Sequence, residues 1–131
     1  MDPEGGSLDR IQIGKGWANE DGTLGEKVYD IAWSGDRSID KNGKVPSVAN
    51  TVNLEDATWD NSVGSTELMD VWTDPEFDPE LEAFYYARVI EIPTPRWTLY
   101  DKVRLGAELG EEVTLTAQQR AYSSPIWYNP K

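Results

Sequence analysis

Residues 83–92 read A-F-Y-Y-A-R-V-I-E-I, and this stretch predicts the strand around which the fold is built. It is rich in aromatic and β-branched side chains, it contains no Gly or Pro, and prolines bound it at both ends. Alternation divides its side chains between two faces: Tyr85, Ala87 and Val89 on one, and Phe84, Tyr86, Arg88, Ile90 and Ile92 on the other. Neither face is polar enough to lie in water, so we expect a central strand covered on both sides.

The composition indicates a single acidic domain. Its 131 residues suit one domain, and six Trp and six Tyr supply large apolar areas for a core. Residues 1–7 are acidic and contain Pro and Gly, which predicts a linker. No run approaches the roughly 20 apolar residues of a membrane helix, so we expect no membrane partner.

The charged and catalytic residue types exclude several function classes. With 24 acidic and 12 basic residues, the net charge is −12, which would repel nucleic acid. The absence of His and Cys excludes Ser-His-Asp and Cys-His catalytic arrangements and the usual zinc sites. A hydrolase would have to use carboxylates alone, as glycosidases do, and the sequence singles out no pair. We therefore expect no catalytic residue, metal or cofactor in this chain.

Residues 8–33 predict a β-hairpin. Leu8, Ile11 and Ile13 give an imperfect alternation, and residues 26–33 alternate again after a turn at Asp21-Gly22. The two glycines at positions 14 and 16 indicate a bulge or the close approach of another backbone.

The middle of the chain is rich in turn residues. Residues 34–48 predict a surface loop, and the fragment Asp40-Lys41-Asn42-Gly43 favours a turn over a calcium loop. Asp74-Pro75 predicts that residues 74–82 begin with a single helical turn. We expect three short strands, at residues 51–54, 57–63 and 67–73.

The segment after the central strand begins with Pro93-Thr94-Pro95-Arg96-Trp97. Two prolines predict a stiff loop over residues 93–101. Either Trp97 and Tyr100 close the end of the core while Arg96 pairs with an acid, or the loop offers all three side chains to a partner or an anion. Residues 104–118 then predict a polar excursion, and residues 119–128 a terminal strand with Pro125 marking an edge.

Several blocks of the sequence resemble the C-terminal region of a bacterial family known as domain of unknown function 3604. They follow one another across nearly the whole chain: residues 8–13, 15–17, 26–35, 71–75, 77–79, 84–86, 88–89, 91–97 and 123–128. Family members are several times longer and resemble metal-dependent phosphoesterases of the PHP type, whose histidine-rich site lies upstream. The resemblance implies a C-terminal accessory module that packs on the N-terminal catalytic domain of its parent.

The resemblance carries three further implications. Export signals in the family imply a periplasmic or secreted location. A further strand precedes the position of Asp2 in the family, which implies an exposed sheet edge and a homodimer formed through it. The pattern Tyr85-x-Ala87-Arg88-Val89 resembles the penultimate strand of immunoglobulin and fibronectin type III domains, which implies an all-β antiparallel sandwich with long loops.

Two functional hypotheses follow. The first is the docking module, whose interaction surface would comprise one face of the central strand and the proline-bounded loop: Phe84, Tyr86, Ile90, Ile92, Arg96, Trp97 and Tyr100. The alternative is a carbohydrate-binding module with an exposed aromatic platform. It requires two or three coplanar, exposed tryptophans from the set Trp17, Trp33, Trp59, Trp97 and Trp127.

Overall fold

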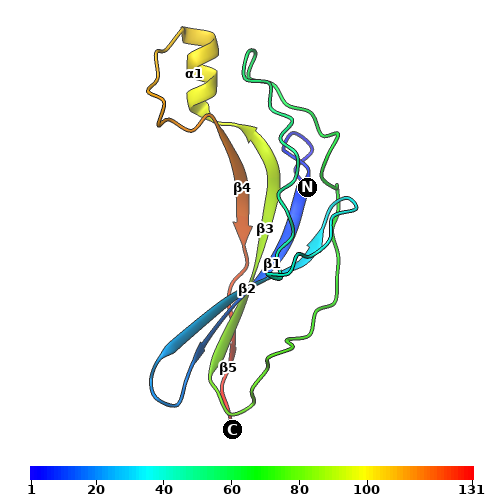
Figure 1. The fold of residues 1–131 in the computed structure, drawn as a ribbon, viewed down its shortest axis with the longest axis vertical. Helices are drawn as coiled ribbons and strands as arrows, with labels where there is room; N and C mark the ends of the chain where they lie inside the picture. The colour runs from blue at the N-terminus through cyan, green and yellow to red at the C-terminus, as the bar shows by residue number, and fades with distance from the viewer.

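The computed structural model describes all residues 1–131 and contains one open antiparallel sheet and one short helix. The elements are β1 (Leu8–Ala18), β2 (Leu24–Trp33), β3 (Ala83–Pro95), α1 (Trp97–Leu105), β4 (Thr116–Tyr122) and β5 (Ile126–Tyr128). The strand order is β2-β1-β3-β4, and β5 also pairs with β3. The sheet is long and bent (Figure 1). We call the end with α1 the helix end, and the end with the β1–β2 turn and the C-terminus the hairpin end.

The central strand is confirmed. β3 pairs with β1 along one edge and with β4 and β5 along the other. It continues to Pro95 instead of ending at Ile92. The prolines fit because the β3–β4 register shifts between Ile90 and Pro93, and an irregular ladder tolerates a residue that lacks an N–H.

The hairpin is also confirmed. β1 and β2 pair antiparallel around a turn in which Gly22 has φ 83° and the Asp21 carboxylate accepts a hydrogen bond from the Thr23 N–H at 2.9 Å. The bulge lies between Ile11 and Gln12 and not at the glycines. Gly14 and Gly16 instead admit aromatic side chains, because a Cβ at either position would overlap the ring of Tyr86 or Phe84.

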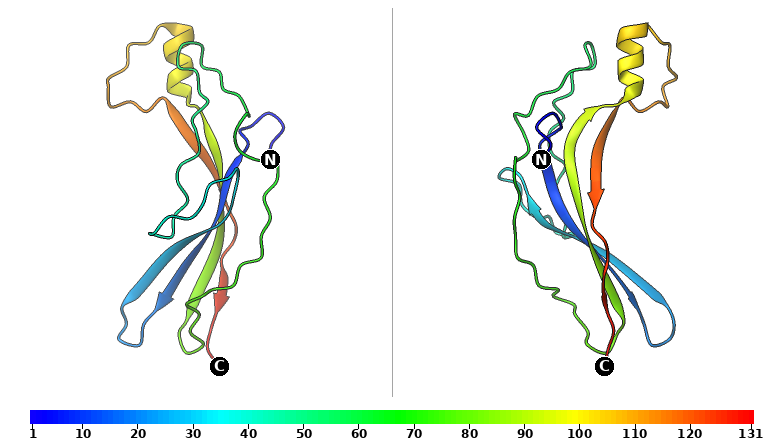
Figure 2. Two further views of the ribbon diagram at one scale, coloured as in Figure 1. Left: turned by 45° about the vertical axis from the view of Figure 1, so that its right-hand side comes forward. Right: turned by 180° about the vertical axis from the view of Figure 1, so that it is seen from behind.

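The structure differs from the expected sandwich, because no second sheet packs on the first. Of the three segments expected as strands, residues 51–54 and 57–63 share one isolated bridge, between Asn53 and Thr58, and residues 67–73 form none. Residues 34–82 are one long connection without helix or strand (Figure 2). Its Asp and Asn side chains bond the backbone two residues further on, which competes with ladder formation.

The turn motifs within this connection follow the same rule. Asp40 accepts hydrogen bonds from the Asn42 and Lys44 N–H groups, so the expected turn forms there. The expected helical turn after Asp74 is replaced by two separate turns. In these, Asp74 caps the N–H of Glu76 and Asp78 caps that of Glu80, each at 2.9 Å.

The stiff loop expected at residues 93–101 is instead the end of β3 followed by α1. Arg96 is extended at the N-cap, and Gly106 ends the helix in the left-handed conformation with φ 66°. Lys102 and Arg104 lie in the last turn, where the helix dipole favours positive charge. This nine-residue helix is the only one, and it lacks the length and apolar character of a membrane span.

The expected terminal strand is divided in two. β4 ends at Tyr122 and β5 begins at Ile126, and Pro125 lies in the break between them, as an edge marker should. The Ser123 N–H still donates to the carbonyl oxygen of Ala87 at 2.9 Å, so both pieces follow the same edge of β3.

The core is thin. The buried hydrophobic residues are mostly small or lie at the helix end: Ala32, Val45, Ala57, Ala83, Ile90, Ile92 and Leu99. The accessible surface is 8918 Å² for 14.7 kDa. A compact monomer of that mass exposes about 6,900 Å², so this chain exposes about 2,000 Å² more. The excess is what a sheet without a second layer would show.

Candidate functional site

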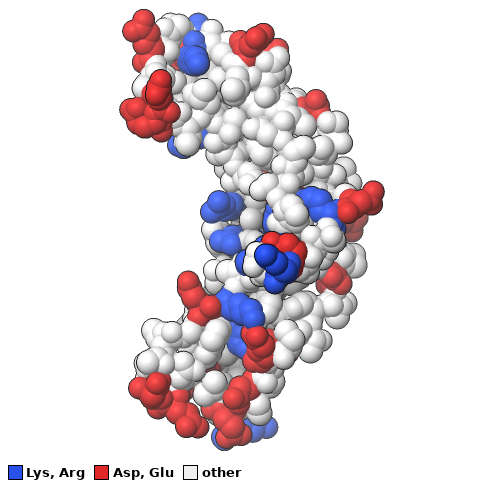
Figure 3. Space-filling view, viewed as in Figure 1, with Lys and Arg blue, Asp and Glu red and all other residues white.

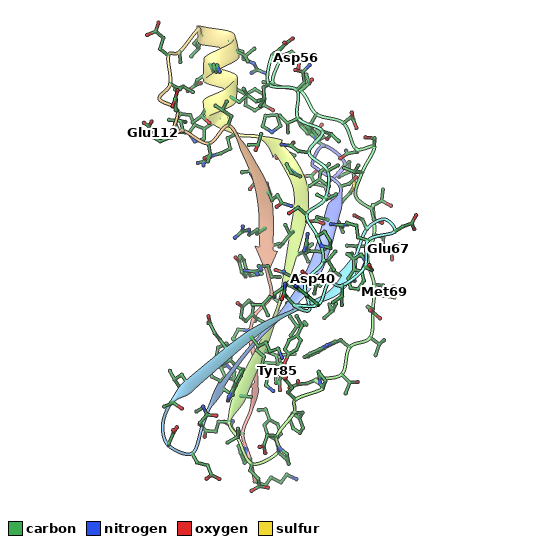
Figure 4. All side chains as sticks on the ribbon, viewed as in Figure 1. Asp40, Asp56, Glu67, Met69, Tyr85 and Glu112 are labelled. Atoms are coloured by element: carbon green, nitrogen blue, oxygen red, sulfur yellow. The ribbon has the colours of Figure 1, made fainter.

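The two faces of the sheet differ at the hairpin end. The covered face carries Lys15, Tyr29 and Tyr85, and the connection crosses it (Figure 4). The open face carries Phe84 and Tyr86, whose rings lie over the glycines of β1. Alternation along the strands produces this division, because paired residues on neighbouring strands share a face.

A strap, residues 71–78, is anchored to the covered face by a buried ion pair. The Lys15 Nζ lies 2.6 Å from Asp74 Oδ2, and the two side chains are only 6% and 7% exposed. Lys15 also donates to the Glu76 carbonyl oxygen at 2.7 Å, and the Tyr85 hydroxyl donates to Asp74 at 2.7 Å. Burial of a lysine requires such partners, so the strap and the strand are matched in sequence.

Further contacts extend the anchorage outward. The Glu76 carboxylate binds Lys27 and the Tyr29 hydroxyl, each at 2.6 Å. The ring of Trp72 lies 4.9 Å from that of Tyr29 and 6.4 Å from that of Tyr85, measured between centroids. The bonds to Glu76 are exposed, and the aromatic contacts add apolar anchorage to them.

The ionisable groups of the strap are tuned by these contacts. Burial alone would raise the pKa of Asp74, but hydrogen bonds from Lys15, the Glu76 N–H and Tyr85 lower it below 3.8. Hydrogen bonds from Lys27 and Tyr29 lower the pKa of Glu76. Burial and the bond to Asp74 raise the pKa of Tyr85 to about 12, and burial and Glu76 raise that of Tyr29.

A buried polar network covers the middle of the sheet on the side opposite the strap. Asp30 accepts hydrogen bonds from Gln12 at 2.5 Å, from the Val45 N–H at 2.8 Å and from Arg10 at 3.3 Å. Arg10 in turn donates to the carbonyl oxygens of Val45 and Pro46. The connection is therefore held over the middle of the sheet, and the open face is confined to the hairpin end.

Asp9 organises a second buried network toward the helix end. Its Oδ2 accepts from Arg10 at 3.1 Å and from Gln118 at 3.0 Å. Its Oδ1 lies 2.7 Å from the Arg37 guanidinium, an ion contact without hydrogen-bond geometry. Both networks therefore tie together segments that are distant in the sequence.

The open face carries an aromatic row of four side chains: Trp127, Phe84, Tyr86 and Tyr122. Successive ring centroids are 5.2, 6.5 and 6.1 Å apart, and the planes of Phe84 and Tyr86 differ by only 17°. Beside the row is a hollow of about 470 Å³, with Gly16 as its floor and Leu24 and Trp127 among its walls. Leu24 is 84% and Trp127 67% exposed, so the hollow opens to solvent.

Two arginines lie at the inner end of the aromatic row. Arg88 is directly opposite Tyr122 in the β3–β4 ladder, and Arg120 is two residues from Tyr122 on the same face. Hydrogen bonds from Arg88 and Arg120 lower the pKa of Tyr122. Figure 3 shows that basic side chains gather around the middle of the molecule, whereas acidic side chains dominate its two ends.

The residues that the sequence indicated as an interaction surface lie in three places. Phe84 and Tyr86 belong to the aromatic row, whereas Ile90 and Ile92 are buried in the core. The other three lie at the helix end, on or beside α1: Arg96, Trp97 and Tyr100.

The contacts at the helix end differ from those expected. The Arg96 guanidinium donates to the Thr114 hydroxyl at 2.6 Å. The aromatic ring of Tyr100 is covered by Arg104, at 4.7 Å from the centroid, and Trp97 is left exposed. Sequence reasoning missed Leu24, Arg120 and Tyr122. The signal in the sequence that could have indicated the open face was Gly14 and Gly16, which lie opposite Tyr86 and Phe84 of β3.

The tryptophans do not form the platform that a carbohydrate-binding module would require. Of the five considered, Trp97 and Trp127 are the exposed ones, at 65% and 67%. They lie at opposite ends of the sheet, on α1 and β5 (Figure 1). The exposed row is built from one Trp, one Phe and two Tyr instead.

No cluster of three or more acidic side chains is placed to hold a metal ion. Neither the curated proteins nor the solved structures contain a match to this chain. A protein family does match, over residues 1–130, and its description is "Protein of unknown function (DUF3604)". Because this match covers almost the entire sequence, the chain belongs to the DUF3604 family.

Proposed function

We propose that this chain is a non-catalytic accessory module that docks, through the open face, on the catalytic domain of a longer DUF3604 protein. The observation that carries the proposal is the aromatic row with its adjoining hollow, left bare on a single-layer sheet. A sheet normally buries its apolar face against another layer. At the hairpin end, the chain supplies a layer for one face only.

The amount of exposed surface supports a macromolecular partner. The excess of about 2,000 Å² over a compact monomer is more than the roughly 800 Å² that one partner buries in a standard protein interface. Aromatic side chains at the centre of such an interface supply most of its binding energy. In the complex, the partner would supply the second layer that the expected sandwich places within this chain.

The covered face does not compete for this role. The strap already satisfies Lys15 and Tyr85 through Asp74, so a partner there would have to replace strong internal contacts. On the open face, Phe84 and Trp127 contact mainly one another and the glycine floor, and a partner would bury them without breaking an ion pair.

The test is binding between this chain and the separately produced remainder of its parent protein. We expect a complex that survives gel filtration, and we expect Trp127→Ser to weaken it by roughly 10- to 100-fold. Val71→Ser is the matched control, because Val71 is 93% exposed on the strap and should leave affinity unchanged.

Two results would contradict the proposal. One is the absence of any complex between the wild-type parts at concentrations of tens of micromolar. The other is turnover of a substrate by the isolated chain, which an accessory module would not show.

A further inference from the structure

We infer that the docking partner is a protein surface that presents a carboxylate to Arg88 and Arg120 and apolar side chains to the hollow beside Trp127. This inference rests on the proposed docking function and specifies the chemistry of the partner. It joins two observations on the open face: an apolar hollow at one end of the aromatic row and two arginines at the other.

The two arginines lack acidic partners in a chain that has twice as many acids as bases. The cations of the buried networks are all paired, as Lys15 is with Asp74 and Arg10 with Asp30. No carboxylate lies within 4.0 Å of Arg88 or Arg120. Most of the other unpaired cations are exposed on loops, on α1 or at the C-terminus, and half-buried Arg96 at the N-cap of α1 donates to Thr114. Arg88 lies half-buried on the central strand.

The orientation of Arg88 is fixed by a neutral group. Its Nε donates to Gln12 Oε1 at 2.8 Å, and Gln12 is itself held by Asp30. Nη2 of Arg88 also donates to this oxygen, and Tyr122 accepts from Arg88 and Arg120, but none of these acceptors is a carboxylate. The amide oxygen therefore orders the guanidinium without neutralising its charge, which is left for an anion. A guanidinium held in this way binds a carboxylate through two parallel hydrogen bonds at little cost in side-chain entropy.

The chemistry of the aromatic row and the hollow distinguishes between the candidate partners that could present the anion. The hollow between Leu24, Phe84 and Trp127 is lined mainly by apolar groups, which fits aliphatic or aromatic side chains better than sugar hydroxyls. A second copy of this chain would bring another net charge of −12, and that repulsion opposes self-association. A protein partner with an acidic residue beside apolar ones satisfies both ends of the row.

The experiment compares two charge reversals of equal size in the docking assay with the remainder of the parent. Arg120→Glu should weaken binding by roughly 10- to 100-fold. Arg104→Glu on α1, outside the open face, should leave affinity unchanged. Wild-type affinity should also fall as salt is raised, and less steeply for Arg120→Glu. Arg120 is exposed, so the reversal should leave folding intact, and circular dichroism checks this.

The outcomes separate this inference from the proposed function. If the wild-type parts do not bind, the docking function itself fails. If they bind and Arg120→Glu binds equally well, docking stands and the acidic partner is refuted. A further outcome is that the wild-type chain binds polygalacturonate or heparin and that Arg120→Glu abolishes this binding. That result would overturn the acidic protein partner in favour of an acidic glycan. Restoration of binding to Arg120→Glu by a Glu→Lys or Asp→Lys change in the partner would identify the carboxylate.

Discussion

The two faces of the hairpin end are built from alternate residues of the same strands, yet they are completed differently. The covered face carries Lys15, Tyr29 and Tyr85, and a distant segment of the chain supplies Asp74 and Glu76 to them. The open face carries aromatic rings over glycines and receives no such segment. One face is completed by polar contacts within the chain, and the other is left apolar.

A chain must cover a surface of its own when that surface carries a buried charge. A buried ammonium group without a partner costs several kcal/mol, so a face with Lys15 at its centre folds only together with its own counterion. An exposed aromatic ring forgoes a gain of about 25 cal/mol for each Å² left in water, but it carries no penalty relative to the unfolded chain, where it is exposed as well. An apolar face can therefore stay exposed until a partner binds, whereas a face with a central charge must be covered by the chain itself.

Loss of the Lys15 counterion on the covered face should destabilise the chain more than the other substitutions on either face. Asp74→Asn should lower the free energy of unfolding by about 3 kcal/mol, because it leaves the Lys15 ammonium buried without a counterion. Urea unfolding followed by circular dichroism measures the loss. Lys27→Met serves as the control, because it breaks the outer ion pair to Glu76, where both side chains are about half exposed. A loss from Lys27→Met as large as that from Asp74→Asn would show that the strap is not held from beneath.

Acid should weaken the same face selectively. The folded-state pKa values of Asp74 and Glu76 are lowered, so their stabilisation is present above their usual values of 3.8 and 4.5 and is lost as the pH falls below them. Tyr85 acts in the opposite direction. Its raised pKa of about 12 favours the neutral hydroxyl, and its contribution is lost as the pH rises through 10 toward 12. Unfolding free energies measured across pH should decline at both extremes.

Asp74→Asn provides the check on the acid limb. The variant has no carboxylate at this position to protonate, so its stability should decline less between pH 5 and pH 3 than that of the wild type. Parallel profiles for the two proteins would assign the acid sensitivity to other carboxylates and leave the strap uninvolved.

Local pattern was sufficient for the part of the fold that is organised by near neighbours. The alternation in residues 83–92 and the Asp21-Gly22 turn predicted the central strand and the hairpin, which the ladders confirm. The prediction of a strand at residues 67–73 failed because no other strand pairs with this segment. Periodicity of side chains indicates an extended segment. Hydrogen-bond partners from elsewhere in the chain decide whether that segment becomes a strand.

The prediction for the helix end failed for a different reason. Pro93 and Pro95 suggested a stiff loop, but both lie within β3, where the ladder with β4 is irregular. The signals for α1 were present in Lys102, Arg104 and Gly106, which favour a helix C-terminus. The candidate surface was divided likewise, because sequence proximity placed Arg96 and Trp97 with Phe84, whereas the length of β3 separates them.

A smaller effect tests whether the open face is free to move. Gly16→Ala places a Cβ where the Phe84 ring lies, so the ring must shift. On an open face it can swing toward solvent, and the free energy of unfolding should fall by only about 1 kcal/mol, the low end for overpacking. A double-mutant cycle with Phe84→Leu should recover most of the loss, because the shorter side chain clears the new methyl group. A loss of about 3 kcal/mol, on the other hand, would mean that something confines the ring.

Charged substitutions at exposed positions of the two faces should change the stability of the isolated chain least. Leu24→Asp introduces a charge beside the hollow at a position that is 84% exposed, and the isolated chain should lose no more than about 0.5 kcal/mol of unfolding free energy. Val71→Asp, at 93% exposure on the strap, should behave in the same way. In the docking assay the two should diverge, because only Leu24 lies on the open face. If Leu24→Asp destabilised the isolated chain strongly while Val71→Asp did not, the chain would already cover this face itself, and the contrast between the two faces would disappear.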